Sequence, residues 1–363
     1  MDAIFDGLLE DSDEEIAAVQ VCIAAVQAAG QAATEGNSSS GDQERGWAGR
    51  FVGSKRKSAR GVCAWFDLYL SPSPTYTSAH FLTLFRVPLR LYRALERELP
   101  LVAATIRKQT DCTGRLGHPL YENLLCSLRR LGNGASFQDL DDQARMSPES
   151  QRKIFLVFLK AVRTRFGPRY LNREPTVAEL QGISDGNAAR GFPACVGSFD
   201  CMKLHWKNCP RALKGQFHNP KEGKLAVISC EAVTDGDLYC WHWFAGRPGN
   251  NNEKTVLVNS PPFMDSLSGR RRMLLSDGYV LDGSRGQWLL YFLGDGAYPR
   301  WAIFYLPDAT TKKEKYAAAQ QVAVRKDVER LFGCQQGCWG ILETFGMSNV
   351  GRRRGSGPRF TPR

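Results

Sequence analysis

In the first half of the chain, apolar residues recur every three or four positions, which is the period of an amphipathic helix. One such segment, residues 119–132, is predicted to stop at Gly132. Its apolar positions are Leu120, Leu124, Leu128 and Leu131. A short helix is expected next, and a longer one begins after Ser147, a favourable N-cap, with Pro148 in its first turn. Three helices with short connections over 119–164 fit either a helix-turn-helix unit or a plain helical bundle.

From residue 193 the pattern changes to short apolar or alternating runs that Gly, Pro and Asp interrupt, which is typical of strands in a mostly buried sheet. The runs are PACVGSF, KLAVISCEAV, LYCWHWFAG and QWLLYFLG. A helical segment follows at about 312–333. Its apolar side consists of Val324, Val328 and Leu331. A sheet followed by a helix predicts an α+β domain over roughly 190–335, with a helical domain before it.

The charge of the chain favours an acidic partner. The formal charge of the 363 residues is +11, yet residues 1–36 hold eight carboxylates and neither Lys nor Arg. The remaining residues therefore carry 48 cations against 29 carboxylates, a formal charge of +19. Clustered Lys and Arg gain free energy by releasing counterions from phosphates, so nucleic acid is the first candidate. An ordinary basic surface is the alternative.

Composition also divides the chain into segments. Residues 1–61 are expected to be an acidic segment followed by a flexible basic linker, in which KRK is a candidate nuclear import signal. Residues 62–185 are assigned to the helical domain, 186–337 to the α+β domain, and 338–363 to a disordered basic tail. The Ala-rich run at 16–33 contains Gln and follows acidic residues, so no membrane partner is expected.

The cysteines do not predict a structural zinc site. The chain contains eleven Cys, but no pair has CxxC spacing. Cys334 and Cys338 lie one helical turn apart, and no second ligand pair follows them. Reduced, mostly buried thiols in an intracellular protein are expected instead.

Three carboxylates lie where elements of the predicted sheet domain end or meet. Asp200 is predicted to end the first strand, Asp295 to end the last, and Glu329 to lie on the following helix beside its apolar side. Hard cations such as Mg²⁺ and Mn²⁺ prefer carboxylate oxygens, and two such ions can promote phosphodiester cleavage. A chain with 37 Asp and Glu residues contains many possible sets of three carboxylates, and a lone Asp at a strand end is usually a turn residue. The three positions alone therefore do not establish a metal site.

Four blocks of the chain resemble, in the same order, the PIF/Harbinger transposases, specifically their plant-type branch. The blocks are GFPACVGSFDCMKLHWKNCPRALKGQF, ISCEAVTDGDLYCWHWFAGRPGNNNEKTVLVNSPPF, LGDGAYPRWAIF and VRKDVERLFG. With the upstream segments FRVPLRLYRAL and DCTGRLG, the similarity spans about 81 to 337. The resemblance implies a ribonuclease H-like catalytic domain of the DDE type, in which the Asp-Asp-Glu triad matches Asp200, Asp295 and Glu329.

The resemblance also implies an activity, cofactors and partners. The chain would be a nuclease that uses two Mg²⁺ or Mn²⁺ ions, held by the triad, to cut DNA at the terminal inverted repeats of a transposon. It would act as an oligomer in the nucleus. A separately encoded Myb-like protein would contribute DNA binding and nuclear entry, and without this protein the chain would stay in the cytoplasm.

Four further residues belong to this candidate site. The family pattern NND reads NNE here, so Glu253 keeps a carboxylate with a longer reach and is a candidate for a supporting role behind the metal ligands. Arg325, Lys326 and Arg330 flank Glu329 on the predicted helix. These three cations are candidate phosphate contacts, and a solvated helix face is the alternative.

The end of the chain keeps a second function open. The family continues past its Glu with further helical segments, whereas the sequence here turns into MSNVGRRRGSGPRFTPR, which resembles a truncated end. The expected function is therefore a DDE nuclease, with impaired cleavage if the end is truncated. The alternative is an inactive, domesticated or decayed relative that binds DNA or protein. A hydrolase of small phosphoesters is a third interpretation, which the basic charge disfavours.

Overall fold

The structure is a computed structural model that describes residues 64–344 with several gaps. The gaps are 108–113, 115, 172–174, 207–208, 210, 212, 221–222, 224, 261–279, 284–285, 302 and 308. The predicted acidic segment and linker at 1–61, with its KRK signal and Ala-rich run, lie outside the described residues. The part of the predicted tail after residue 344 lies outside them as well.

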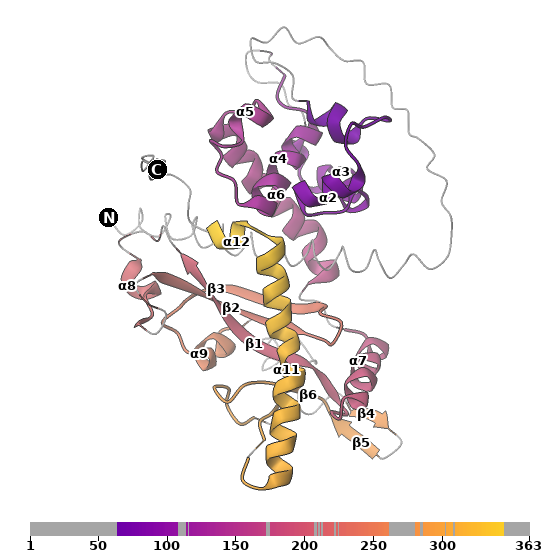
Figure 1. The fold of residues 1–363 in the computed structure, drawn as a ribbon, viewed down its shortest axis with the longest axis vertical. Helices are drawn as coiled ribbons and strands as arrows, with labels where there is room; N and C mark the ends of the chain where they lie inside the picture. Colours follow the sequence, from indigo (N-terminus) through magenta and orange to yellow (C-terminus); the bar gives the residue numbers. More distant parts are fainter. Residues whose placement is uncertain are drawn as a thin grey trace, which may run out of the picture.

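The first part of the described chain is helical; all its helices except the last lie together at one end of the molecule, and the last lies beside the sheet (Figure 1). Its elements are η1 (Phe66–Leu70), α2 (Ser78–Phe85), α3 (Leu89–Val102), η2 (Ala104–Ile106), α4 (Leu120–Asn133), α5 (Asp141–Ala144), α6 (Pro148–Tyr170) and α7 (Val177–Ala189). Helices α4 and α6 pack around buried Leu and Phe side chains. The helix-turn-helix interpretation stays a prediction.

The helix starts follow the sequence signals, and one predicted stop is wrong. The Ser147 hydroxyl accepts a hydrogen bond from the Ser150 N–H and caps α6, as predicted. Helix α4 continues past Gly132 and ends at Gly134, whose φ of 62° is the left-handed conformation that favours glycine. Gly132 is instead needed for close packing, since a Cβ there would lie 2.7 Å from Arg86 Cγ.

The second part of the chain forms a mixed five-stranded sheet in the order β3-β2-β1-β6-β7. The strands are β1 (Cys195–Trp206), β2 (Ala226–Thr234), β3 (Cys240–Pro248), β6 (Tyr291–Leu293) and β7 (Phe304–Tyr305). Strands β1, β2 and β3 pair antiparallel, whereas β6 runs parallel to β1 and β7 parallel to β6. A separate hairpin consists of β4 (Val280–Gly283) and β5 (Gly286–Leu289), and short helices α8 (Lys214–Phe217) and α9 (Glu253–Val258) complete this part.

The sheet with flanking helices confirms the predicted α+β class and agrees with the ribonuclease H-like domain that the resemblance implied. One detail differs, because β1 does not end at Asp200. The strand continues for six residues, with Met202, Leu204 and Trp206 buried and His205 exposed between them. This alternation is the period of a strand, and it places Asp200 in the middle of β1, opposite Ala232 of β2.

Long helix α11 (Lys312–Cys338) lies across one face of the sheet (Figure 1). Its predicted apolar side is buried, with Val324 6%, Val328 0% and Leu331 3% exposed. The helix starts at Thr311, whose hydroxyl and the Glu314 carboxylate form a capping box. The other face of the sheet packs against α9 and an aromatic group around Phe199. No helix in the described residues is both long and apolar enough to cross a membrane.

The chain stays ordered past residue 337, where the domain was predicted to end. Helix α11 runs to Cys338, and short helix α12 (Ile341–Thr344) follows it. Trp339, Ile341 and Leu342 are buried in the same hydrophobic core as the helices and the sheet. The first seven residues of the predicted tail, 338–344, therefore belong to the folded part.

Candidate metal centre

The parallel pairing of β1 and β6 brings Asp200 and Asp295 to the same level of the sheet. Ser198 of β1 pairs with Leu293 of β6, so two further residues along each chain reach Asp200 and Asp295. A bulge precedes this point at Gly197, whose φ is 145°. A Cβ at this position would meet the Thr234 carbonyl at 2.6 Å, so only glycine allows this approach.

Helix α11 fixes both strands just before the acids. The buried Gln321 amide donates to the Gly294 carbonyl at 2.6 Å, one residue before Asp295. The Ser198 hydroxyl donates to the Val324 carbonyl at 3.5 Å, two residues before Asp200. Asp295 then turns away from the strand, and its Oδ1 accepts the Ala297 N–H at 2.8 Å.

Glu253 joins these two acids from the other side of the sheet. It is the first residue of α9, a helix that starts because Asn252 accepts the Thr255 N–H at 2.8 Å. Val256 and Leu257 anchor α9 by burial. Carboxylate oxygens of Asp200, Glu253 and Asp295 all lie within 4.8 Å of one another. Glu253 was expected to support the ligands from behind, yet its carboxylate lies within the group.

The electrostatics of this group suit a cation. Burial, followed by the negative charges of Asp295 and Asp200, raises the pKa of Glu253 to about 7. Burial also raises the pKa of Asp200, although the Cys201 N–H and the Arg325 charge act in the opposite direction. Glu253 Oε2 is buried and accepts no hydrogen bond from an N–H or O–H of the described residues, and its hydrogen bond with the Asp295 carboxylate requires a proton on Glu253. A buried carboxylate oxygen without such a donor, next to two more carboxylates, is what a hard divalent cation would satisfy.

Glu329 lies outside this group of three carboxylates in the described structure. Arg325 connects it to the group, because Nη1 donates to Asp200 Oδ2 at 2.6 Å and Nη2 donates to Glu329 Oε1 at 2.7 Å. The Glu329 side chain is 47% exposed, in contrast to 13% for Asp200. Asp200 and Asp295 therefore lie next to each other, whereas Glu329 is connected to Asp200 only through the Arg325 guanidinium.

The three predicted phosphate contacts on α11 differ in their surroundings. Arg325 is held by the two carboxylates, and Lys326 is exposed. Arg330 pairs with Asp327 at 2.9 Å, and Arg190 binds the same buried carboxylate at 2.5 Å. Lys326 is therefore accessible to a DNA phosphate. Arg325 and Arg330 would first have to break their ion pairs with carboxylates before they could bind one. Their role in binding DNA stays a prediction.

Further polar groups lie next to Asp200 within the sheet, at Cys201 and at Glu231 opposite it. The Tyr298 hydroxyl donates to Cys201 Sγ at 3.4 Å, and burial raises the pKa of both groups, which stay protonated. Fully buried Glu231 of β2 contacts His242 of β3 at 3.3 Å, and the same His242 nitrogen contacts Ser260 Oγ at 3.0 Å. This pair was not predicted, although an acid and a His are visible inside two apolar strand runs of the sequence.

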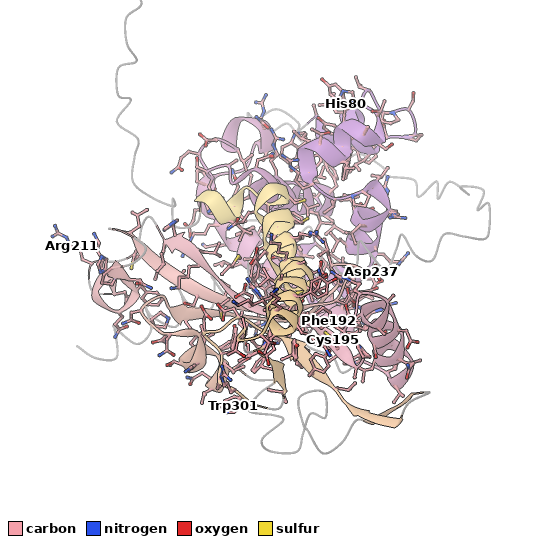
Figure 2. All side chains as sticks on the ribbon, turned by 60° about the horizontal axis from the view of Figure 1, so that its bottom comes forward. His80, Phe192, Cys195, Arg211, Asp237 and Trp301 are labelled. Atoms are coloured by element: carbon pink, nitrogen blue, oxygen red, sulfur yellow. The ribbon has the colours of Figure 1, made fainter. Side chains whose placement is uncertain are left out.

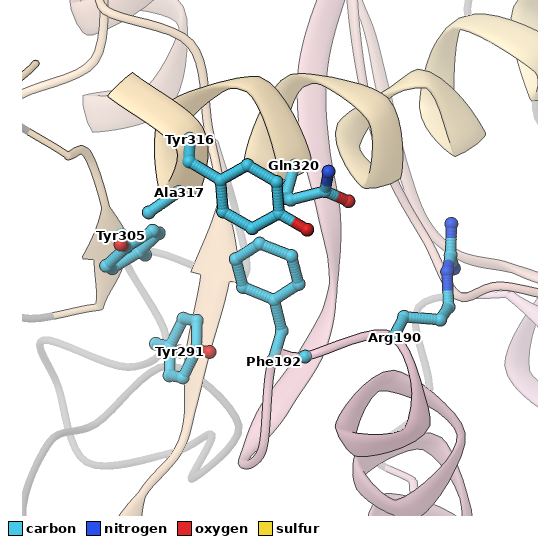
Figure 3. Close-up of a pocket in the computed structure, with 8 residues that line it drawn as sticks. Arg190, Phe192, Tyr291, Tyr305, Tyr316, Ala317 and Gln320 are labelled. Atoms are coloured by element: carbon cyan, nitrogen blue, oxygen red, sulfur yellow. The ribbon is translucent and has the colours of Figure 1, made fainter. Parts of the chain in front are cut away.

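A separate cavity of about 330 Å³ lies beside the N-terminal half of α11, away from the acids (Figure 3). Its lining residues are Arg190, Gly191, Phe192, Tyr291, Tyr305, Tyr316, Ala317 and Gln320. Figure 2 shows Phe192 and Cys195 near α11 at the start of β1, whereas Arg211 lies far along the sheet beyond the end of that strand. The lining contains no carboxylate, so this cavity is not the candidate metal centre.

Comparison with known proteins agrees with the resemblance. Residues 168–349 match a family described as plant transposon protein. "Protein ALP1-like" of Arabidopsis thaliana is 25% identical over 185 residues, which cover 50% of this chain and 44% of that protein. The chain therefore matches less than half the length of this curated relative. No solved structure matches the chain significantly. The family match includes all four carboxylates discussed above.

Proposed function

Because the chain belongs to the plant transposon protein family, a transposase-derived family, we propose that it is a DDE nuclease that cleaves DNA phosphodiester bonds with a divalent metal. The single observation that carries the proposal is the group formed by Asp200, Glu253 and Asp295, whose oxygens lie within 4.8 Å of one another. These acids come from strand β1, from the turn directly after the parallel strand β6 and from a short helix, so the fold brings them together from distant parts of the chain.

The chain's own residues have defined tasks in this proposal. Asp200, Glu253 and Asp295 would hold the first ion, and Glu329 would join a second one with Asp200. Mg²⁺ or Mn²⁺ at these positions would activate a water molecule and stabilise the leaving oxygen. Tyr298 and Cys201 lie beneath the site as neutral groups and keep bulk water from that side. Arg325 would stabilise the negative charge of the DNA phosphate.

The partners follow from the family and the charge. DNA is the proposed substrate because the chain outside residues 1–36 carries a formal charge of +19, and the choice of transposon terminal inverted repeats rests on the resemblance. Action as an oligomer in the nucleus, together with a Myb-like protein, is part of the proposal and rests on the resemblance alone.

A second candidate function has two observations in its favour. Arg325 already pairs with Asp200 and Glu329, and Glu253 stands where the family pattern has the shorter Asp. A relative that has lost cleavage and binds DNA or protein through its basic surface would tolerate both features. Cleavage assays separate the two candidates.

The test replaces Asp200 by Asn and measures nicking of DNA that carries inverted repeats, with Mg²⁺ or Mn²⁺. We expect Asp200→Asn to lower nicking by at least about 100-fold, since one metal ligand is lost. DNA affinity should stay equal or rise, because a charge that repels phosphate is removed. Asp237→Asn is the matched control, since Asp237 is exposed in the β2–β3 turn.

Three outcomes are informative. Nicking that disappears in Asp200→Asn and persists in Asp237→Asn supports the nuclease. Equal nicking in both variants would show that another site or a contaminant cuts the DNA. Binding without nicking in the wild-type protein would favour the non-catalytic candidate.

A further inference from the structure

The Arg325 side chain lies between two carboxylates that the proposed nuclease would use as metal ligands. Its Nη1 donates to Asp200 at 2.6 Å, and its Nη2 donates to Glu329 at 2.7 Å. Only 15% of the Arg325 side chain is exposed, so its pair with Asp200 lies largely out of water, whereas the Glu329 side chain is 47% exposed. Charge-assisted bonds of this length are strong, and Arg presents its donors in one rigid plane.

Asp200 takes part in two different groups. On one side it faces Glu253 and Asp295, where a buried carboxylate oxygen of Glu253 accepts no hydrogen bond from an N–H or O–H of the described residues. On the other side it shares the Arg325 guanidinium with Glu329. The first side therefore offers oxygen atoms to a cation, whereas the second side already holds a cation of the chain, the Arg325 guanidinium.

A guanidinium and a metal ion cannot occupy the same space between Asp200 and Glu329. Mg²⁺ needs oxygen ligands at about 2.0–2.1 Å, and a guanidinium has only donors and no lone pair to offer. An ion shared by these two carboxylates must therefore displace both Arg325 bonds. The freed guanidinium then needs another anion, and phosphate oxygens fit the same pair of donors.

We infer that Arg325 controls whether Glu329 is available as a metal ligand, an inference that rests on the proposed nuclease function. While Arg325 bridges Asp200 and Glu329, the chain binds one divalent ion, at Asp200, Glu253 and Asp295. A DNA phosphate that binds the guanidinium releases Glu329 for a second ion. DNA and the second ion thus strengthen each other's binding, and the coupling is reciprocal.

The test counts bound Mn²⁺ by the loss of the free-ion signal in electron paramagnetic resonance. We expect the wild-type protein to bind one ion tightly without DNA, and Arg325→Gln, whose neutral side chain cannot replace the ion pairs, to bind two. Adding a short duplex DNA should tighten the second ion by about tenfold in the wild-type protein and leave Arg325→Gln unchanged. Lys315→Gln is the control on the same helix, because Lys315 is exposed near the start of α11 and is not part of the acid group or of the predicted phosphate contacts.

Each other outcome overturns the inference. One ion in both the wild-type protein and Arg325→Gln would show that Arg325 does not withhold Glu329, and the metal centre itself would stand. No Mn²⁺ binding at all would overturn both the metal centre and this inference. The wild-type titration with and without DNA needs no substitution, so an equal affinity for the second ion overturns the inference even if Arg325→Gln does not fold.

Discussion

The Glu253 carboxyl faces two other carboxylates, and its protonation is therefore linked to both folding and metal binding. Its pKa is about 7 in the folded protein, whereas an ordinary Glu has a value of 4.5. Between these two values the folded chain retains a proton that the unfolded chain has lost. The contribution of Glu253 to the free energy of unfolding therefore falls as pH rises from about 4.5 to 7.

Glu253→Gln should remove this pH dependence. With a chelator present, we expect the melting temperature of the wild-type protein to fall between pH 5 and pH 8 by roughly 2–4 °C more than that of the variant, about 1 kcal/mol after allowance for solvent screening. Saturating Mn²⁺ should reverse this loss at pH 8, because the ion takes the place of the proton. Glu149→Gln, at an exposed carboxylate of α6, is the control. Equal pH slopes in all three proteins would contradict the linkage.

Single residues of the site were predictable to different degrees. Asp200 and Asp295 follow from the strand pattern and the resemblance, since parallel strands bring equivalent positions to one level. The Arg325–Glu329 contact was visible as an i, i+4 pair on a predicted helix. The second hydrogen bond of Arg325, to Asp200, could not be predicted from the sequence, because it depends on how α11 is rotated about its axis over the sheet. The inward direction of Glu253 depends on the turn after β3 and had no signal of its own.

Among the elements, α11 positions the site most directly. It supplies Arg325 and Glu329 to the site, and its Val324, Val328 and Leu331 side chains are buried against the sheet and the core. The helical period of a 27-residue segment makes such a helix easy to predict. Short α9 has only six residues and one cap signal, so the sequence did not predict it. The predicted end of β1 at Asp200 was wrong, because a polar residue inside a strand resembles a strand end.

Val328→Ala should show how far the stability of the chain depends on α11. The Val328 side chain is fully buried, so removing two methyl groups should lower the free energy of unfolding by about 2 kcal/mol. The control Val322→Ala lies on the same helix with 44% of Val322 exposed, and a change within about 0.5 kcal/mol is expected. Urea unfolding of both variants measures the difference. Equal midpoints would mean that α11 does not pack on the sheet as described.

At the scale of the whole molecule, one hydrophobic core joins the two predicted domains. Phe85, Leu128 and Phe158 of the helical part belong to the same cluster as Trp243 of β3 and Val328 of α11. The predicted boundary at residues 185 and 186 falls inside helix α7, and the change from helices to strands, between Ala189 and Cys195, lies within a shared core. Periodicity reports local structure, and contacts between distant segments leave no such periodic signal. We therefore expect the described part to unfold as one cooperative unit.

The connection between α11 and α12 offers the sharpest test of this shared core. The Gly340 N–H donates to the Gly132 carbonyl of α4 at 2.9 Å, and a Cβ on Gly340 would lie 2.8 Å from the backbone of Asn133. Because backbone atoms cannot move aside as a flexible side chain can, Gly340→Ala should cost about 1–3 kcal/mol. Gly337→Ala is the matched control, since a Cβ there meets open space within the last turn of α11.

The two substitutions should therefore have opposite signs. A glycine inside a helix lowers stability relative to Ala by about 0.5–1 kcal/mol, so Gly337→Ala should raise the urea midpoint while Gly340→Ala lowers it. Tryptophan fluorescence and far-ultraviolet circular dichroism should give the same midpoint for each protein, because helices and sheet unfold together. If Gly340→Ala instead separates the two transitions, the helical part and the sheet are independent units. In that case the shared core does not transmit stability to the strands and helix that hold the acids.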